Sequence, residues 1–398
     1  MIYKQFGDLK LSHLGMGNMR LPTVGERGPI DEPKARKVIE YAYEHGVNYF
    51  DTAFRYHEGD SERFSGEVLN QYPRDTWNLA SKFPGHMLRR EGDQLVFTGF
   101  GASRPEYFDS VQQIFQMQLE KCRVDYFDFY LLHGLAESSY GFYNDPDIGI
   151  IDYLLSQKKA GRIKHFGFSS HARAESIEKY LTQWEGLFEL VQIQINYLDW
   201  TLQDAKAKYE SIVKHGLAVV AMEPVRGGRL AKLPDDAEAM LKAARPNDST
   251  ASWALRFLQG LPGMTVILSG MTELEHVIDN VKTLSVDNPA GEEEKELLQK
   301  VVMSMTNMAP CTACRYCCEG CPQNLDIPKL ISLYNEAAHD RMLFGIGDVL
   351  RTMSESEMPA ACVACGECAK LCPQEIDVPD IMKKFADMIA NPPPNPWG

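Results

Sequence analysis

The sequence lacks long hydrophobic runs and an excess of basic residues. No apolar stretch approaches the roughly 20 residues needed to cross a bilayer, and residues 1–10 alternate polar and apolar side chains without the apolar core of a signal peptide. Asp and Glu number 55 against 41 Lys and Arg, so the formal net charge is −14. Proteins that bind phosphate backbones concentrate Lys and Arg. We therefore expect a cytoplasmic protein whose partner is neither a membrane nor a nucleic acid.

A GxGxxG phosphate loop is also missing, LGMGNM at 14–19 being the nearest approach, which disfavours a doubly wound sheet. Instead, eight short apolar or β-branched runs alternate with amphipathic helical stretches between Leu11 and Met303. This alternation is typical of a (β/α)8 TIM barrel of the α/β class. We predict strands in the segments 11–21, 47–53, 77–83, 126–134, 163–170, 190–198, 217–225 and 264–270, and helices over 33–45, 61–71, 105–122, 148–160, 173–184, 202–215, 249–259 and 272–284.

Two segments lie outside this pattern. Residues 84–103 follow the third predicted strand, show no clear periodicity, and are long enough to form a lid or a substrate wall. A helix over 292–305 leads out of the barrel. We therefore place the barrel at 1–300 and a small, mainly α-helical, ferredoxin-like domain at 301–398, which ends in an extended Pro-rich tail at 391–398.

Nine of the ten cysteines fall between Cys311 and Cys372. In a reducing compartment such clustered cysteines indicate metal ligands rather than disulfides. They form two copies of C-x2-C-x2-C-x3-C-P, the spacing of two-cluster bacterial ferredoxins, in which the fourth cysteine of each run ligates the other cluster. We predict two [4Fe–4S] clusters, one held by Cys311, Cys314, Cys317 and Cys372, and the other by Cys362, Cys365, Cys368 and Cys321.

The two copies are similar beyond their cysteines, because CPQNLDIPKL (321–330) is echoed by CPQEIDVPDI (372–381). The 40 residues between Cys321 and Cys362, with a predicted helix over 328–339, exceed what a compact ferredoxin uses. The module therefore resembles the α-helical ferredoxin type. Zinc is the alternative, but a zinc site takes four thiolates and gives no reason for two complete runs. Cys318 falls outside the pattern, and we expect Cys122 to be a small core residue.

Four polar residues, Asp51, Tyr56, Lys82 and His133, follow early predicted strands, where barrel enzymes keep their chemistry. Taken singly, such an Asp is often a helix cap, such a Lys solvated, and such a His bonded to a backbone carbonyl. Taken together they are chemically coherent. The Lys82 ammonium would stabilise a Tyr56 phenolate and lower the tyrosine pKa from near 10, so that it donates a proton near neutrality. Asp51 would orient Lys82, and His133 would bind the substrate oxygen.

The segments around these residues resemble the aldo-keto reductase family over residues 1–282. DTAFRYHEGDSE (51–62) is similar to the family's DTA-x-x-Y-G-x3-SE motif, and VDYFDFYLLHG (124–134) to the stretch that ends in its catalytic His. GFSS (167–170), VQIQINYL (191–198) and ILSGMTELEHVIDN (267–280) are similar to its cofactor-binding segments. The resemblance implies that Tyr56 is the general acid and that Asp51, Lys82 and His133 assist it.

The same resemblance implies a nicotinamide cofactor, NAD(P)H. Its carboxamide would be held by Ser169, Ser170 and Gln192, with Met222 against the ring. For the two serines a helix N-cap is the alternative, and for Gln192 a polar residue of the barrel interior. Pyrophosphate and adenosine would contact Gly228, Leu230, Ser269, Gly270, Thr272 and Asn280.

Departures from the family pattern leave the cofactor open. His276 stands where NADPH-binding members usually carry a basic residue, Ser269 where proline is common, and His57 where Gly commonly follows the tyrosine. The first two departures weaken a preference for NADPH over NADH. A nicotinamide also transfers two electrons as hydride whereas each cluster carries one, so a flavin that replaces or joins the nicotinamide is an alternative.

We expect an iron–sulfur oxidoreductase that acts on a small carbonyl or alcohol substrate. The clusters would relay electrons to or from a ferredoxin-like or other redox protein. Two alternatives remain: an NAD(P)H-dependent carbonyl reductase whose clusters are structural, and an electron-transfer adaptor with an inactive barrel.

Overall fold

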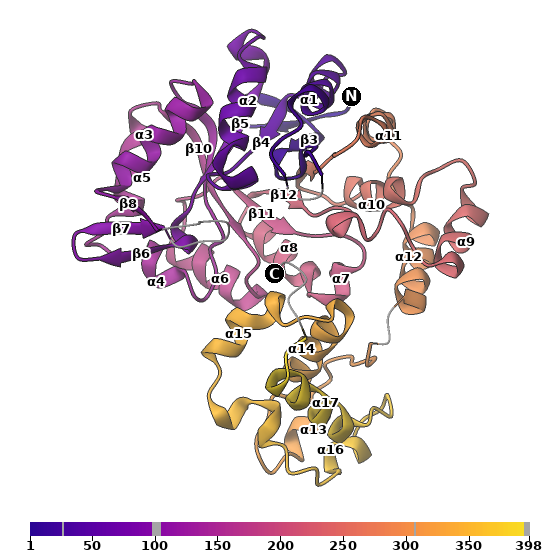
Figure 1. The fold of residues 1–398 in the computed structure, drawn as a ribbon. Coiled ribbons are helices and arrows are strands. Elements are labelled where there is room, and N and C mark those ends of the chain that lie inside the picture. The colour runs from indigo at the N-terminus through magenta and orange to yellow at the C-terminus, as the bar shows by residue number, and fades with distance from the viewer. Residues whose placement is uncertain (26–27, 98–104, 306–307, 394–398) are drawn as a thin grey trace. The chain divides into compact units, whose positions relative to one another are not determined.

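The computed structural model describes residues 1–25, 28–97, 105–305 and 308–393 (Figure 1). The chain divides into two compact units, one of Met1–Trp200 and Asp204–Leu298, the other of Thr201–Gln203 and Gln299–Gly398. Most of the Pro-rich tail predicted at 391–398 lies outside the described residues.

Eight parallel strands of the first unit close into a barrel in the order β3-β4-β5-β9-β10-β11-β12-β13. This closed order confirms the (β/α)8 barrel and rules out the doubly wound sheet. Each predicted strand segment contains one barrel strand. The strands are β3 (Leu14–Gly17), β4 (Tyr49–Asp51), β5 (Asn78–Phe83), β9 (Phe127–Leu132), β10 (Ile163–Ser170), β11 (Leu190–Gln194), β12 (Ala218–Met222) and β13 (Met264–Ser269).

Helices surround these strands (Figure 1), and the longer ones bury apolar side chains. Their starts follow local capping signals, since the side chains of Asp31, Ser110 and Ser249 each accept a hydrogen bond from a backbone N–H in the first turn. The helices that match predicted ones are α1 (Glu32–Glu44), α2 (Ser61–Leu69), α3 (Val111–Cys122), α5 (Ile150–Lys159), α6 (Ala174–Gln183), α8 (Ala205–Lys214), α10 (Thr250–Gln259) and α11 (Leu274–Leu284). Three more were not predicted, namely α4 (Tyr140–Tyr143), α7 (Asp199–Leu202) and α9 (Asp235–Ala244).

An N-terminal hairpin, β1 (Tyr3–Phe6) and β2 (Leu9–Ser12), contributes to the barrel interior. Phe6 packs edge-on against Phe129 of β9, with ring centroids 5.4 Å apart. Phe6, Phe129, Tyr49 and Leu190 belong to one buried apolar cluster with residues of β5, β12 and β13. This cluster fills the barrel, so the polar residues predicted for function are confined to the strand ends.

The segment 84–103, predicted to lack periodicity, contains β6 (Leu88–Glu91) and β7 (Gln94–Phe97). They form an antiparallel sheet with β8 (Glu106–Phe108), which lies in the segment predicted as a helix. The predicted helix start at 105 is therefore wrong, since α3 begins at Val111. These strands have three or four residues each, too few for a two-residue periodicity to show. Only cross-strand pairing and the burial of side chains such as Phe97 against Phe54 define them. The rest of the predicted wall, 98–103, lies outside the described residues.

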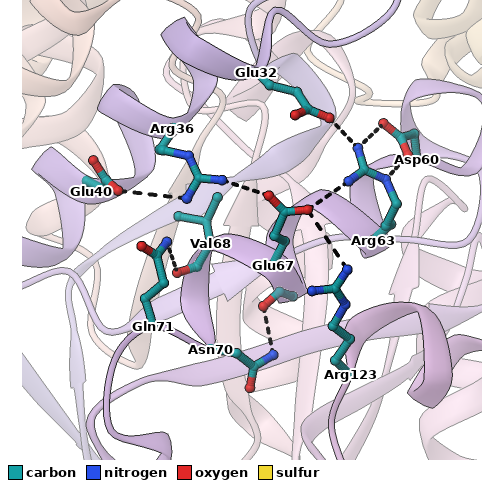
Figure 2. A network of polar contacts seen from close by, with 11 residues as sticks. Glu32, Arg36, Glu40, Asp60, Arg63, Glu67, Val68, Asn70, Gln71 and Arg123 are labelled. Atoms are coloured by element: carbon teal, nitrogen blue, oxygen red, sulfur yellow. Dashed lines mark hydrogen bonds and ion pairs between the residues drawn. The ribbon is translucent and has the colours of Figure 1, made fainter.

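Helices α1 and α2 are joined by a network of ion pairs on the barrel's outer layer (Figure 2). The Arg63 guanidinium lies 2.5 Å from Glu32 of α1, 2.5 Å from Asp60 and 3.0 Å from Glu67. Arg36 of α1 reaches Glu67 from the other side at 2.8 Å. The shared Glu67 thus connects two cations from different helices.

The second unit is helical, as predicted. Its short helices α13 and α16 follow the first two cysteines of each run, and the longer α14 and α17 follow the CPQ segments. The helix α12, predicted over the same residues, leads into this unit. The bounds are α12 (Glu292–Met305), α13 (Tyr316–Glu319), α14 (Ile327–Asp340), α15 (Gly347–Thr352), α16 (Glu367–Lys370) and α17 (Val378–Ala390).

The two cysteine runs fold as matching repeats. Ala313 and Ala364 have φ of 52° and 53°, and Arg315 and Gly366, the next matching pair, have φ of 67° and 79°. Both α14 and α17 begin with an aspartate whose carboxylate accepts a backbone N–H and with a proline in the first turn. The sequence repeat is therefore a structural repeat as well.

Candidate active site and cysteine sites

The structure brings Asp51, Lys82 and Tyr56 together at the carboxyl ends of β4 and β5. The Lys82 Nζ atom lies 2.5 Å from Asp51 Oδ1 and 2.8 Å from the carbonyl oxygen of Thr52, and it donates to both. Its third neighbour is the Tyr56 hydroxyl at 3.5 Å. Lys82 is fully buried and Asp51 almost so, which makes this pair an internal cation held beside a phenol.

Burial decides the protonation of this site. Burial raises the pKa of Tyr56 more than the Lys82 charge lowers it, so the pKa of Tyr56 lies above its usual value. Lys82 does lower the pKa of Tyr56, as predicted, but the prediction that this pKa lies below its usual value is wrong. Burial alone would lower the pKa of Lys82, yet Asp51 and Tyr56 outweigh it and raise that pKa. At neutral pH the site therefore holds an ammonium next to a protonated phenol, which can donate its proton.

His133 follows β9 and faces the tyrosine. The rings of Tyr56 and His133 lie edge to face with centroids 6.0 Å apart. The pKa of His133 lies well below its usual value, mainly because the ring is buried and secondly because His86, Lys82 and His171 are close to it. The imidazole is thus neutral and can donate a hydrogen bond without carrying charge.

The structure adds His86, which the sequence reasoning did not single out. Its ring centroid lies 4.5 Å from that of His133. A Cβ atom on Gly134 would come within 2.9 Å of the His86 ring, and Gly134 has φ of +61°, so a glycine is required there. The sequence offered one indication of a role for His86, which is that it lies three residues after Phe83, in the segment predicted as a substrate wall.

Tyr143 of α4 holds the two loops that carry these histidines. Its hydroxyl lies 3.0 Å from the carbonyl oxygen of Phe83 and 2.6 Å from that of His133. A Cβ atom on Gly85 would lie 2.4 Å from the Tyr143 ring. The ends of β5 and β9 are therefore locked at a fixed separation.

The residues predicted to bind a nicotinamide carboxamide occupy the ends of β10 to β12. The Ser170 hydroxyl donates to Leu135 O at 2.6 Å and accepts from Ala172 N at 3.0 Å. It does not cap the next helix as the alternative expected, because the N-cap residue of α6 is Arg173. Ser169 Oγ accepts from Gly134 N at 3.0 Å. Gln192 Nε2 lies 3.9 Å from the Met222 sulfur. Its Oε1 is buried with no hydrogen-bond partner among the described residues, so it can accept a bond from a bound amide.

The residues predicted for pyrophosphate and adenosine lie beyond β12 and β13. Asn280 donates to Ser269 Oγ at 3.0 Å, and Thr272 donates to Arg20 O at 2.9 Å. A Cβ on Gly270 would lie 2.9 Å from Arg20 Cβ. Gly228 is exposed with φ of +95° and has open space where a Cβ would lie, whereas Leu230 is buried. The structure thus places Ser269 and Asn280 in mutual contact and Leu230 in the core.

Two departures from the family pattern have a structural reason. His57 adopts φ of 52° and ψ of 49°, the left-handed region that glycine enters freely. There its Nε2 accepts a hydrogen bond from Leu21 N at 3.2 Å. His276 is exposed in the first turn of α11, where its Nδ1 accepts from Glu273 N at 3.2 Å and so caps the helix.

The sequence analysis also missed a buried ion pair next to Gly227 and Gly228. Arg226 Nε lies 2.9 Å from Asp199 Oδ1, and both side chains are buried. Asp199 also accepts from Gln194 at 2.8 Å and Asn196 at 2.7 Å. Because Arg226 itself has φ of +49°, this pair holds the backbone after β12 in an unusual conformation.

The cysteines of the second unit line two separate hollows, each with thiols from both repeats. The thiols that line one hollow are those of Cys311, Cys314, Cys317 and Cys372. Those that line the other belong to Cys362, Cys365, Cys368 and Cys321. The fourth cysteine of each run therefore lies with the first three of the other run.

The thiols of each hollow influence one another. Burial raises the pKa of Cys311, and the nearby thiols of Cys372 and Cys314 raise it further. In the second repeat, burial and then Cys362 and Cys365 raise the pKa of Cys368. The backbone N–H groups of Ala313 and Ala364 point at sulfur, 3.4 Å from Cys311 Sγ and Cys362 Sγ. These N–H groups are ready to stabilise thiolates.

The two remaining cysteines line neither hollow. Cys318 lies beside Cys317, and its thiol adds to the effect of burial in raising the pKa of Cys317 to about 12. Cys122 is completely buried at the end of α3, as a small core residue would be.

With this geometry established, comparison with known proteins defines the class. The profile of the Aldo/keto reductase family matches residues 13–301, and that of a 4Fe-4S dicluster domain matches residues 310–376. The chain belongs to the aldo/keto reductase family and carries a 4Fe–4S domain after its barrel. It is an oxidoreductase, as predicted.

Relatives cover most of the barrel at modest identity. The Bacillus subtilis uncharacterized oxidoreductase YqkF is 25% identical over 322 residues, 73% of this chain and 92% of the relative. The NADH-specific methylglyoxal reductase of Escherichia coli is 25% identical over 311 residues, 70% of this chain and 92% of the relative. The structure of the holo form of aldo-keto reductase AKR11C1 from Bacillus halodurans is similar at a TM-score of 0.59 and 28% identity, covering 76% of this chain and 96% of that one.

A Klebsiella pneumoniae aldo/keto reductase solved with NADP and acetate shares the fold, with a TM-score of 0.57 at 19% identity. Within the described residues, none of the helices is long and apolar enough to span a membrane.

Proposed function

We propose that the barrel interconverts a small carbonyl compound and its alcohol, with Tyr56 as the proton donor to the carbonyl oxygen. The observation that carries this proposal is the buried Lys82 ammonium, 2.5 Å from Asp51 and 3.5 Å from the Tyr56 hydroxyl. Asp51 already neutralises the Lys82 charge, so the phenol is not required to stabilise the cation. The cation, however, stabilises the phenolate that remains after proton donation.

In the reducing direction, Tyr56 gives its proton to the carbonyl oxygen as that oxygen gains negative charge. Lys82 then compensates the phenolate, and Asp51 keeps Lys82 in place. The neutral His133 donates a hydrogen bond to the same oxygen and fixes its approach. When bound, a nicotinamide would supply the hydride, which carries both electrons to the carbonyl carbon.

The chain's own residues fit such a cofactor. The buried Oε1 of Gln192, which has no hydrogen-bond partner among the described residues, would accept a hydrogen bond from the carboxamide N–H. Ser169 would contact the carboxamide, and Met222 would lie against the ring. Ser170 would shape this pocket through the loop that it binds. Gly228, Leu230, Ser269, Gly270, Thr272 and Asn280 would border the pyrophosphate and adenosine, directly or through the backbone.

We expect NADH to serve at least as well as NADPH. The N-cap and first turn of α11 carry Glu273, Glu275 and His276 and neither Lys nor Arg. A 2′-phosphate placed there would meet carboxylates instead of a cation. A flavin that replaces or joins the nicotinamide remains the alternative, because single electrons leave through clusters.

For the second unit we propose two [4Fe–4S] clusters on the two sets of thiols, those of Cys311, Cys314, Cys317 and Cys372, and those of Cys362, Cys365, Cys368 and Cys321. The support is that each hollow is lined by four cysteines in the crossed pattern that this spacing requires. Such clusters carry one electron each and would exchange it with a ferredoxin-like or other redox protein. The net charge of −14 suits a partner with a basic surface.

The experiment is turnover of full-length protein, purified without air, with NADH or NADPH and a panel of small aldehydes and ketones. Tyr56→Phe should lower kcat/KM by roughly 10²- to 10⁴-fold, the range for loss of a general acid. Tyr3→Phe is the matched control, because Tyr3 is exposed in the N-terminal hairpin and should leave kcat/KM unchanged.

Two results would favour the alternatives. Unchanged NADH turnover in a folded Cys314→Ser protein would point to structural clusters. Reducible clusters in a protein whose turnover with nicotinamide is absent, and which Tyr56→Phe does not alter, would point to an adaptor with an inactive barrel.

A further inference from the structure

The two hollows of the cysteine module differ in the types of residue that line them. Besides its cysteines, the hollow of Cys311 is lined by Arg315, Thr312 and Gln374 together with apolar side chains. In the hollow of Cys362, every other described lining residue is apolar or glycine. The repeat is therefore symmetric in backbone and asymmetric in surroundings.

The asymmetry centres on one matched position. Arg315 and Gly366 occupy the same place in the two repeats, both in the left-handed region, with φ of 67° and 79°. Glycine enters that region without cost, whereas a residue with a side chain pays about 1 kcal/mol. The first repeat thus carries a guanidinium at a place where the backbone itself favours glycine.

The charged residues around the first cysteine run are also more positive in sum than those around the second. Residues 311–331 carry two basic and two acidic side chains, whereas the matching residues 362–382 carry one basic and four acidic ones. Arg315 is ion-paired with Asp326 at 3.1 Å, and because both side chains are exposed, water weakens that pair as well as the field of Arg315 at the cluster. In the second repeat Asp377 matches Asp326, and Gly366 stands where Arg315 stands in the first repeat.

These differences act on reduction potential. Reduction adds one negative charge to a cluster that its four thiolates already make anionic, so a nearby cation favours the reduced form. Apolar surroundings and nearby carboxylates disfavour it, because they stabilise additional negative charge poorly. All of the observed differences therefore have the same sign.

On the basis of the proposed function, we propose that the cluster held by Cys311, Cys314, Cys317 and Cys372 has the higher reduction potential, and that Arg315 is the residue that sets the difference. An electron supplied by an external one-electron reductant then settles on this cluster first. The cluster of Cys362, Cys365, Cys368 and Cys321 is the stronger reductant of the two.

The test is a potentiometric titration of the full-length protein with dithionite, followed by EPR. We expect two one-electron waves at different potentials. Arg315→Gly should lower the upper wave and bring the two together, and it should fold because it removes backbone strain. Gly366→Arg, at the matching left-handed position, should raise the lower wave.

Two further variants separate charge from other effects. Arg315→Lys keeps the cation and should move the upper wave less than Arg315→Gly. Arg351→Gln is the matched control, since Arg351 is exposed on α15, is ion-paired with Asp348 and lines neither hollow. It removes the same charge and should leave both waves in place.

Iron and sulfide analysis of the same samples distinguishes the two levels of failure. Fewer than two clusters per chain would overturn both the proposed cofactor content and this inference. Two clusters with coincident waves, or waves that Arg315→Gly does not move, would overturn this inference alone.

Discussion

The imidazole of His86 lies edge-on against that of His133, with ring centroids 4.5 Å apart and an angle of 67° between the ring planes. The two histidines come from loops after different strands, which Tyr143 ties together. Next to burial, the neighbouring His86 holds the pKa of His133 down. Sequence motifs identify His133, and the structure places His86 in contact with it.

Replacing His86 by Ala should therefore raise the pKa of His133 and shift the acid limb of the pH profile of kcat/KM to higher pH. Because burial is the larger cause and remains in the variant, the pKa of His133 should stay below its usual value, so the extra loss of kcat/KM should appear only at the acid end of the measured pH range. Turnover measured from pH 5 to 9 checks this. His45→Ala, at the exposed end of α1, is the control. A profile that falls uniformly without a shift would contradict the electrostatic role.

His13 should make the stability of the barrel depend on pH. Burial lowers its pKa from 6.5 to about 4, opposed by its hydrogen bond to Thr265 O. Between these two values the unfolded chain binds the proton and the folded chain does not, so stability falls as pH falls from about 6.5 to about 4. The full effect is roughly 3 kcal/mol, from about 1.36 kcal/mol per pKa unit.

Urea unfolding of the barrel, followed by its tryptophan fluorescence at several pH values, measures this slope. His13→Gln should flatten it between pH 4 and 6.5, whatever its effect at pH 7. An equally steep slope in that variant would show that other groups carry the dependence.

The crossed arrangement of the thiols predicts which cluster each cysteine affects. Cys372→Ala should disturb the cluster of Cys311, Cys314 and Cys317, although Cys372 belongs to the second run in sequence. Iron content should drop and the EPR signal of one cluster should change. Cys318→Ala is the matched control, because Cys318 lines neither hollow, and it should keep the full iron content. Loss of the other cluster's signal would refute the crossed assignment.

The ion-pair network between α1 and α2 should contribute modestly to stability. Arg63→Ala removes contacts with Glu32, Asp60 and Glu67 at a site where 35% of the arginine side chain is exposed. Exposed pairs are worth about 0.2–1 kcal/mol each, so we expect a loss of about 1 kcal/mol that shrinks in high salt. Denaturant unfolding at low and high salt measures it, with Lys37→Ala of α1 as the control.

Much of this molecule could be predicted from local pattern. The eight barrel strands lie where apolar runs alternate with amphipathic stretches, because the burial of a strand or a helix face is written into the spacing of its own residues. The crossed grouping of Cys372 with Cys311 follows from cysteine spacing alone. The antiparallel β6–β8 sheet was missed, because its short strands depend on partners up to 13 residues away.

The sequence by itself determined which groups meet in the active site, since Asp51, Lys82 and His133 sit at or just beyond the ends of strands that a parallel barrel must bring to one face. Only the tertiary structure decided how those groups behave. The pKa of Tyr56 lies above its usual value because burial outweighs the cation beside it, and His133 is held neutral partly by His86. Both effects depend on the solvent excluded and the charges assembled by residues far apart in the chain, which no local pattern records.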